Sequence, residues 1–232
     1  MWIKICGLTD PKQARALATL RPDAIGLNFY AKSPRFVSTS AARKISDAVG
    51  PQVERIGVFV EPSSEELRRT VVECGLSGVQ VHSADEQHAL ADMRLDAGAV
   101  TRRICGFQVG APGLSHVRDY LKDHPANEWM ADACLADALV QGMFGGTGKI
   151  APWQVLRDDY RRDEWPPLIL AGGLRPENVA EGIATVRPWG VDVASGVESS
   201  PGIKDLERVA RFILEARRAF AELERGRPSP VA

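Results

Sequence analysis

Two consecutive apolar runs in the last third of the chain end in small residues that are suited to binding an anion. One run ends in the pair Gly172-Gly173 and, after an amphipathic segment at 176–186, the next ends in Ser195-Gly196. Backbone N–H groups at such ends can approach an oxyanion closely, and a helix that begins beyond them adds a favourable dipole. These four residues therefore predict a phosphate site, although tight turns would also explain a single Gly-Gly pair.

Reactive side chains also stand where other apolar runs end. Thiol, imidazole and carboxyl groups transfer protons, and a guanidinium group binds carboxylates or phosphates. The positions are Cys6, the loop Tyr30–Arg35, Glu61, His82, Gln108 and Asp137. In a parallel barrel the carboxyl ends of all strands meet at one face, so we expect these side chains to lie around one mouth.

The pattern of apolar runs and amphipathic segments predicts about eight strand-helix repeats with no linker between them. The chain opens with a short strand that stops at Cys6, after which Asp10-Pro11 caps a helix. Further strands are expected at 23–29, 56–60, 78–82, 104–109, 129–137, 168–171 and 191–194. Helices are expected at 41–48, 63–72, 85–93, 114–121, 153–160, 176–186 and 203–223.

This alternation indicates an α/β protein with a single (β/α)8 TIM barrel over residues 1–225 and a disordered tail at 226–232. In such a barrel the loops after the seventh and eighth strands commonly bind phosphate, which places the glycine-bearing ends where a phosphate site belongs. The length of 232 residues is slightly below the roughly 250 residues typical of the fold.

Composition narrows the class of partner. The formal net charge is −1, so no basic field invites nucleic acid, and a small enclosed ligand is the better expectation. The chain shows no signal-peptide pattern and no apolar run near the roughly 18 residues of a membrane span, which predicts a soluble cytoplasmic protein. The four widely spaced cysteines form neither a metal-ligand pattern nor a disulfide framework, so we expect reduced thiols and no metal site.

Six ordered motifs together resemble the phosphoribosylanthranilate isomerase family over nearly the whole length. They are KICGLTD at 4–10, GLNFYAKSPRFV at 26–37, VQVH at 79–82, GGTGK at 145–149, LAGGLRPENV at 170–179 and VDVASGVESSPGIKD at 191–205. The resemblance implies a phosphosugar substrate, no redox cofactor, no metal and no obligate protein partner. The reaction it implies is an Amadori rearrangement of N-(5-phosphoribosyl)anthranilate in tryptophan biosynthesis.

Such a rearrangement needs one proton donor and one proton acceptor. Cys6 matches the family's general base, although a thiol with a reference pKa of roughly 8.5 must first become a thiolate. Asp137 matches the general acid, which near pH 7 requires a pKa raised by about two units through burial or a neighbouring anion. Asp132 is the weaker alternative for the acid. The family usually has two leucines before its aspartate, where this chain has Leu135-Ala136.

The same resemblance implies roles in binding. Arg35, after the Ser33-Pro34 turn, is expected to pair with the anthranilate carboxylate, although a surface arginine is also plausible. His82 is expected to line the pocket or to be a satisfied core histidine. Asp192 is expected either to accept a hydrogen bond from a ribose hydroxyl or only to orient loops, and Glu61 and Gln108 to be structural or rim residues.

A glycine-rich segment is expected to close over the substrate or to help bind phosphate. It consists of Gly145, Gly146, Thr147 and Gly148. The chain departs from the family pattern at two places. After the glycine-rich segment, Ala151-Pro152 replaces the usual Phe-Asp, and Ser83 occupies a position where the family prefers glycine. They affect the loop and the pocket width but remove neither proton-transfer group.

Two other classes remain open from the residues. Another phosphosugar barrel, such as indole-glycerol-phosphate synthase or a ribulose-phosphate epimerase, would require a catalytic lysine at a strand end or a His and Asp metal set, and neither pattern is clear. A catalytically silent barrel would bind a phosphosugar or act as a partner domain, and the presence of both Cys6 and Asp137 argues against it.

Overall fold

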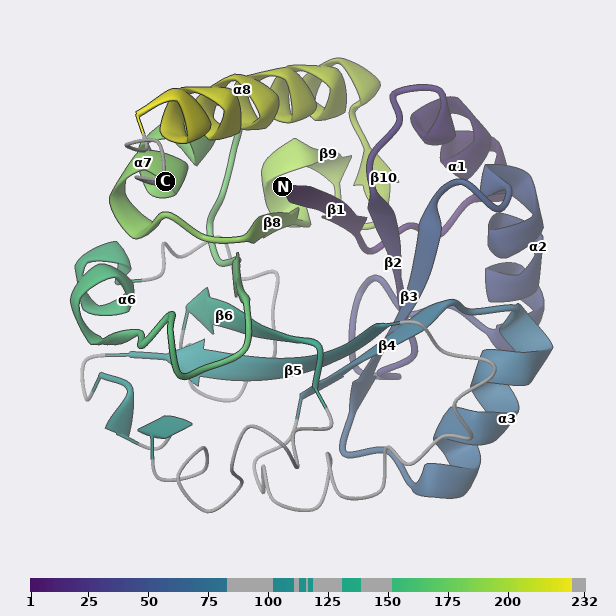
Figure 1. Ribbon diagram of the computed structural model, residues 1–232. Coiled ribbons are helices and arrows are strands. Elements are labelled where there is room, and N and C mark those ends of the chain that lie inside the picture. The colour runs from purple at the N-terminus through teal and green to yellow at the C-terminus, as the bar shows by residue number, and fades with distance from the viewer. Residues whose placement is uncertain (83–101, 111–112, 116, 119–130, 139–151, 227–232) are drawn as a thin grey trace, which may run out of the picture.

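Eight parallel strands close into a barrel in the order in which they occur along the chain (Figure 1). The computed structural model describes residues 1–82, 102–110, 113–115, 117–118, 131–138 and 152–226. The barrel strands are β1 Trp2–Cys6, β2 Ala24–Asn28, β3 Glu54–Val60, β4 Gly78–His82, β5 Arg102–Val109, β6 Ala133–Ala138, β7 Leu168–Leu170 and β8 Gly190–Val193. The predicted single (β/α)8 barrel is confirmed.

Helices surround the barrel on its outside (Figure 1). They are α1 Pro11–Ala18, α2 Thr39–Val49, α3 Ser64–Cys74, α6 Trp153–Asp159, α7 Val179–Val186 and α8 Leu206–Arg225. The predicted cap at Asp10 is confirmed, because its side chain accepts a hydrogen bond from the backbone of Lys12 and Pro11 begins the helix. Ser63 caps α3 through the N–H of Glu66 in the same way.

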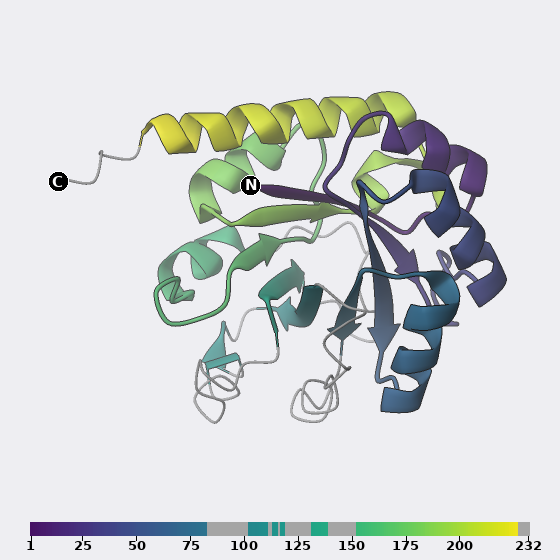
Figure 2. The same ribbon diagram turned by 45° about the vertical axis from the view of Figure 1, so that its right-hand side comes forward.

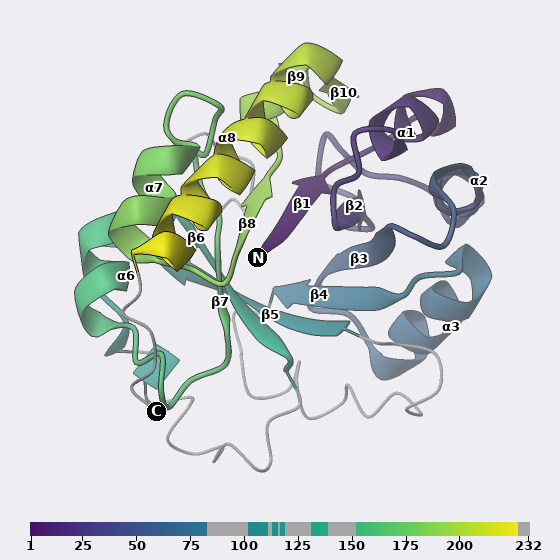
Figure 3. The ribbon, with the colours of Figure 1, turned by 45° about the horizontal axis from the view of Figure 1, so that its top comes forward.

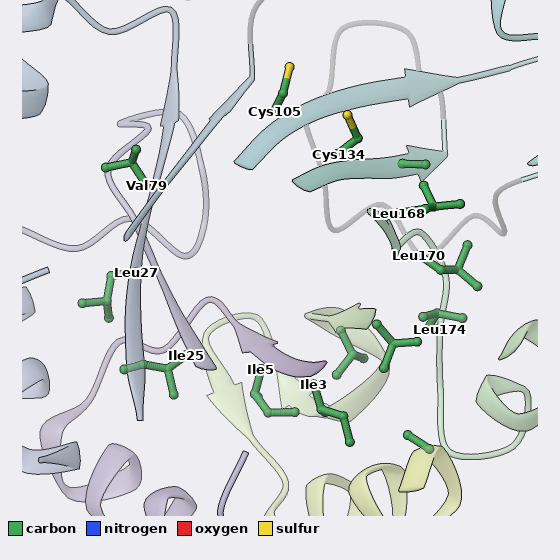
Figure 4. Packing of buried hydrophobic residues seen from close by; sticks show 14 of the residues in the cluster. Ile3, Ile5, Ile25, Leu27, Val79, Cys105, Cys134, Leu168, Leu170 and Leu174 are labelled. Carbon is green, nitrogen blue, oxygen red and sulfur yellow. The ribbon is translucent and has the colours of Figure 1, made fainter. Parts of the chain in front are cut away.

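The outer core lies between the barrel and the helices. Ile3 and Ile5 alternate with inward-facing residues on β1 and point out of the strand, where they join the outer cluster of buried residues (Figure 4). The long helix α8 crosses one side of the barrel (Figures 2 and 3). Its buried stripe includes Val209, Phe212 and Phe220. This packing fixes β1 and β8 against the helix layer.

The barrel interior has an apolar lower layer and a polar upper layer. A separate buried cluster fills its amino-terminal part with Trp2, Ala24, Ile56, Ile104, Ala133, Leu135, Ile169 and Ala171. Two positions further along their strands, the inward-facing residues are Lys4 on β1 and Asp137 on β6, and both are buried. Inward-facing polar groups are therefore gathered toward the carboxyl ends of the strands.

The amino end of the barrel is closed by an aromatic and ionic cluster. The rings of Trp2 and Trp189 stack at 5.6 Å, and the guanidinium group of Arg102 lies over both. Arg102 also donates two hydrogen bonds to Glu54, at 2.7 and 2.8 Å. These contacts serve stability at the end of the barrel that is away from the polar layer.

Several predicted boundaries were wrong. The last helix begins at Leu206 rather than Ile203, because β10 Ile203–Lys204 pairs with β9 Glu198–Ser200 and Asp205 then caps the helix. The helix expected from Pro176 begins at Val179, because Arg175 to Asn178 form a turn closed by the Asn178 side chain.

The sixth strand begins at Ala133 rather than at residue 129, since Ala131 and Asp132 are not part of it. The helix expected at 85–93 lies outside the described residues, as does most of the one expected at 114–121. Gly226 ends α8 as its C-cap, and the rest of the predicted tail, 227–232, also lies outside them.

Candidate functional site

Cys6 is the last residue of β1 and is 8% exposed at the carboxyl end of the barrel. Its register partner on β2 is Gly26, where an added Cβ atom would lie 2.5 Å from the Cys6 sulfur. A side chain at position 26 would therefore displace the thiol. Gly7 makes room in the same way for Arg35, and its φ of +82° is a conformation that glycine adopts without strain.

A buried lysine lies beside the thiol. Lys4 is 0% exposed and shares the inward phase of β1 with Cys6. The register of β1 against β8 places Lys4 opposite Asp192, and Lys4 Nζ donates to Asp192 Oδ1 at 2.9 Å. Lys4 and Cys6 are successive inward-facing positions of β1, so the ammonium charge acts on the thiol. Burial opposes its charge, but Asp192 and Cys6 raise the pKa of Lys4 above its ordinary value, so it carries an ammonium group.

Burial dominates the ionisation of the thiol. It raises the pKa of Cys6 above its ordinary value, and the nearby charges of Lys4 and Lys204 offset only part of this effect. Cys6 in the free protein is therefore predominantly a thiol at neutral pH. A thiolate formed here is a strong base because its conjugate acid is weak.

Arg35 belongs to a second buried ion cluster. Its Nε donates to Glu198 Oε1 at 2.9 Å and its Nη2 to Glu198 Oε2 at 2.6 Å, which is the bidentate geometry expected for arginine and carboxylate. Lys204 Nζ donates to Glu198 Oε1 at 2.6 Å and to the carbonyl of Ala194 at 3.1 Å. Arg35 is only 8% exposed, so the surface-arginine alternative is wrong.

The turn before Arg35 forms as its sequence predicts. The Ser33 N–H donates to the carbonyl of Tyr30, and Ser33 Oγ accepts a hydrogen bond from the Arg35 N–H at 3.1 Å. This turn sets the direction in which the guanidinium group enters the barrel mouth.

The two ion clusters together carry an excess positive charge. The cations are Lys4, Arg35 and Lys204, and the carboxylates are Asp192 and Glu198, which leaves a net charge of +1. Arg35 and Lys204 lower the pKa of Glu198 despite its burial, so its carboxylate stays charged. An uncompensated buried charge is costly, and an anionic group that enters the mouth would relieve that cost.

His82 ends β4 and is buried, with its ring packed where a Cβ atom on Gly106 would otherwise lie. Its Nε2 is 2.7 Å from the side-chain nitrogen of Gln80, so Nε2 accepts and Nδ1 carries the proton. Burial and the charge of Lys4 lower the pKa of His82 to about 4, which makes the ring neutral at pH 7. Within the described part of the chain, the Nδ1 of His82 and the Oε1 of Gln80 have no partner, so the ring is buried with one nitrogen unsatisfied. Its role in lining the substrate pocket stays a prediction.

Asp137 lies near the end of β6 and is 5% exposed, opposite Gln108 on β5. It shares the inward phase of Leu135, which belongs to the inner apolar cluster. All barrel strands are parallel, so Asp137 and Cys6 stand at the same end of the barrel, separated on one side by β7 and β8.

Asp132 does not fit the alternative role of acid at this mouth. It precedes β6 at the amino end, where it accepts hydrogen bonds from the backbone N–H and the guanidinium group of Arg103. Glu61, by contrast, is an exposed residue directly after β3, as expected of a rim residue.

The predicted phosphate loops pack against each other. Gly172 and Gly173 adopt positive φ angles of 81° and 65°, and an added Cβ on Gly196 would collide with the carbonyl of Leu174. Ser195 begins a short 3-10 turn, Ser195–Val197, beside these glycines. The glycines thus serve both a tight turn and the close approach of two loops. Gly145, Gly146, Thr147 and Gly148 lie outside the described residues, and their role as a closing segment stays a prediction.

Four residues of the mouth were missed from the sequence: Lys4, Gln80, Glu198 and Lys204. Lys4 and Gln80 share the inward phase of β1 and β4 with Cys6 and His82, and this two-residue spacing was the available signal. Glu198 and Lys204 lie within the last quoted motif, but nothing local indicates that Glu198 pairs with Arg35.

The described residues contain neither a candidate membrane span nor a candidate metal site. No helix in that part of the chain is both long and apolar enough to span a bilayer. No group of three or more His, Cys, Asp or Glu side chains in the same residues is placed to hold a metal ion. All four cysteines are buried without a disulfide.

The chain is similar to known proteins over nearly its full length. The family profile described as N-(5′-phosphoribosyl)anthranilate (PRA) isomerase matches residues 3–215. The N-(5′-phosphoribosyl)anthranilate isomerase of Chlorobaculum parvum is 43% identical over 220 residues, which cover 93% of this chain and 94% of the relative.

Solved structures agree with the sequence comparison. The phosphoribosyl anthranilate isomerase of Thermotoga maritima has a TM-score of 0.79 and 32% identity, and the match covers 94% of this chain and 99% of that one. A phosphoribosyl anthranilate isomerase in complex with reduced 1-(o-carboxyphenylamino)-1-deoxyribulose 5-phosphate has a TM-score of 0.76 and 32% identity, with the same coverage.

Proposed function

This chain belongs to the N-(5′-phosphoribosyl)anthranilate isomerase family of tryptophan biosynthesis, and we propose that Cys6 is the general base and Asp137 the general acid of the reaction. The reaction converts N-(5-phosphoribosyl)anthranilate into 1-(2-carboxyphenylamino)-1-deoxyribulose 5-phosphate. The observation that carries the proposal is the position of both groups, each buried, at one end of the closed barrel.

The two groups have complementary tasks. Asp137 donates a proton to the furanose ring oxygen, and the ring C–O bond breaks to give an iminium ion at C1. The Cys6 thiolate then removes the proton from C2, and the electron pair of that C–H bond forms the enolamine. Loss of the enol proton and protonation of C1 complete the isomerisation to the ketone, so no net proton or electron is consumed.

Charge at the mouth supports an anionic substrate. Arg35 uses its Nε and Nη2 for Glu198, which leaves its Nη1 to pair with the anthranilate carboxylate. The +1 excess of the two ion clusters favours the same carboxylate. The phosphate is assigned to the two packed loops through Gly172, Gly173, Ser195 and Gly196. A related isomerase has been solved in complex with reduced 1-(o-carboxyphenylamino)-1-deoxyribulose 5-phosphate, which carries both a carboxylate and a phosphate.

Two further contacts complete the binding site. The free Nδ1–H of His82 is a donor for a substrate oxygen that enters the mouth. Asp192 has one carboxylate oxygen on Lys4, and its Oδ2 is assigned to a ribose hydroxyl. A role of Asp192 only in orienting loops is less consistent with its buried ion pair inside the barrel.

The proposal is tested by loss of anthranilate-type fluorescence when freshly made phosphoribosylanthranilate is added to the purified protein and to its Cys6→Ala and Asp137→Asn variants. Each variant is expected to lose turnover by about 10²-fold or more, the scale of general acid or base catalysis. Binding of a product analogue should change little in both, because neither group anchors the carboxylate or the phosphate.

Unchanged turnover in either variant would show that its proton-transfer role is misassigned. Absence of turnover in the unsubstituted protein, with analogue binding retained, would instead support the catalytically silent barrel. The histidine-pathway aminoimidazole substrate, assayed in parallel, measures the breadth of the activity.

A further inference from the structure

Lys4 is an unusual residue for its position. The inner face of the barrel around it is apolar below, and an unpaired ammonium group there would be expensive to bury. A buried ion pair is often replaceable by apolar residues of similar volume without loss of stability. Packing alone therefore does not explain why a charged pair, Lys4 with Asp192, stands two residues from Cys6 on the same face.

The strand register fixes Lys4 on the inner face of the barrel beside Cys6. Backbone register between β1 and β8 fixes Lys4 beside Asp192, and their 2.9 Å contact uses one of the three ammonium protons. Cys6 is the next inward-facing position on the same strand and is also buried, so the ammonium group and the thiol are neighbours inside the barrel. The Lys4 side chain is 0% exposed and that of Asp192 9%, so solvent screens the charge only weakly.

The other cations of the mouth are engaged elsewhere. Arg35 is bound through two nitrogens to Glu198, and Lys204 is bound to Glu198 and to the carbonyl of Ala194. The charges of both lysines act on Cys6, and the effect of Lys4 is the larger. Among the described residues, Lys4 is thus the cation best placed to stabilise negative charge on the sulfur.

We propose that Lys4 is a positioning residue of the isomerase: its ammonium group, held in place by Asp192, is the counter-ion of the Cys6 thiolate during proton abstraction. The inference rests on the proposed role of Cys6 as base. It assigns Asp192 a second task beside substrate binding, namely to hold the Lys4 side chain and keep it charged.

The test measures ionisation of Cys6 directly, through the ultraviolet absorbance of its thiolate in a pH titration, with the Cys6→Ala variant as the background. Lys4→Met removes the ammonium group at similar volume, and Lys4→Arg retains a cation. Lys4→Met is expected to move the titration midpoint of Cys6 upward by at least about one pH unit, because a neighbouring positive charge is lost. Lys4→Arg should restore most of the shift.

Kinetics give the second readout. The pH profile of kcat/KM for Lys4→Met should move to higher pH in parallel with the titration, and Lys4→Arg should move it back. A loss of packing would lower activity at every pH without moving the profile. If Lys4→Met alone fails to fold, the double variant Lys4→Met with Asp192→Asn leaves no orphaned carboxylate. Its midpoint is compared with that of Asp192→Asn alone, because the charge of Asp192 itself raises the pKa of Cys6.

The inference would be overturned by an unchanged Cys6 titration in Lys4→Met relative to the unsubstituted protein, or in the double variant relative to Asp192→Asn. This result is distinct from failure of the proposed function, because retained turnover in Cys6→Ala would remove Cys6 as the base whatever the titration shows.

Discussion

His82 should make the protein sensitive to acid well above the range in which carboxylates titrate. The ring is buried at the end of β4, and burial together with the charge of Lys4 lowers its pKa from 6.5 to about 4. In the unfolded chain the imidazole is exposed and titrates near its reference value of about 6.5. Protonation therefore favours the unfolded state over the whole interval between these two values.

The sign and size follow from linkage. Because the folded-state pKa is depressed, the neutral ring contributes its full stability above about pH 6.5, and this contribution is lost as the pH falls toward 4. A difference of about 2.5 pKa units corresponds to roughly 3.4 kcal/mol in total, of which about 1.4 kcal/mol is lost by pH 5.5 and about 2.5 kcal/mol by pH 4.5. These are large fractions of a typical stability of roughly 5–15 kcal/mol.

The assay is urea unfolding at about pH 7.5, 5.5 and 4.5, compared between the unsubstituted protein and His82→Gln. Glutamine does not titrate and can still form a hydrogen bond with Gln80, so it reports the pH dependence of all other groups. The free energy of unfolding should fall more steeply with acid in the unsubstituted protein, by about 2 kcal/mol or more at pH 4.5. Parallel losses in the two proteins would refute the argument, since His82 would then be charged or solvated in the fold.

Three further predictions concern the mouth of the barrel. Gly26→Ala should lower the free energy of unfolding by about 1–3 kcal/mol and reduce kcat, because the new Cβ would lie 2.5 Å from the Cys6 sulfur. Urea unfolding and turnover assays test this, and a variant with unchanged stability and unchanged kcat would contradict it. The thiolate absorbance of Cys6, measured against Cys6→Ala, should develop only in the alkaline range, because burial raises the pKa of the Cys6 thiol. A thiolate signal already complete at pH 7 would show that the thiolate exists in the free protein. Glu198→Gln should lower the free energy of unfolding by about 3–5 kcal/mol and raise KM, because Arg35 and Lys204 lose their shared carboxylate. An unchanged KM would show that this ion cluster does not contribute to substrate binding.

Much of the site was predictable from local pattern. Apolar runs placed Cys6, His82 and Asp137 at strand ends, and the parallel barrel then required them to share one face. Helix caps at Asp10 and Ser63 were equally local, since each needs only its own next turn. Such features depend on neighbours within a few residues, which the sequence displays directly.

Sequence alone thus determined the eight-strand alternation, the end of the barrel that carries chemistry and the motifs that indicate the isomerase family. Only the tertiary structure decided that Lys4 meets Asp192 across 188 residues and that Arg35 meets Glu198 across 163. It also shows that a side chain at position 26 would collide with the Cys6 sulfur, which explains the glycine there. The physical reason is that the partner of an inward-facing charge is set by the register in which the barrel closes, and that register is a property of all eight strands together.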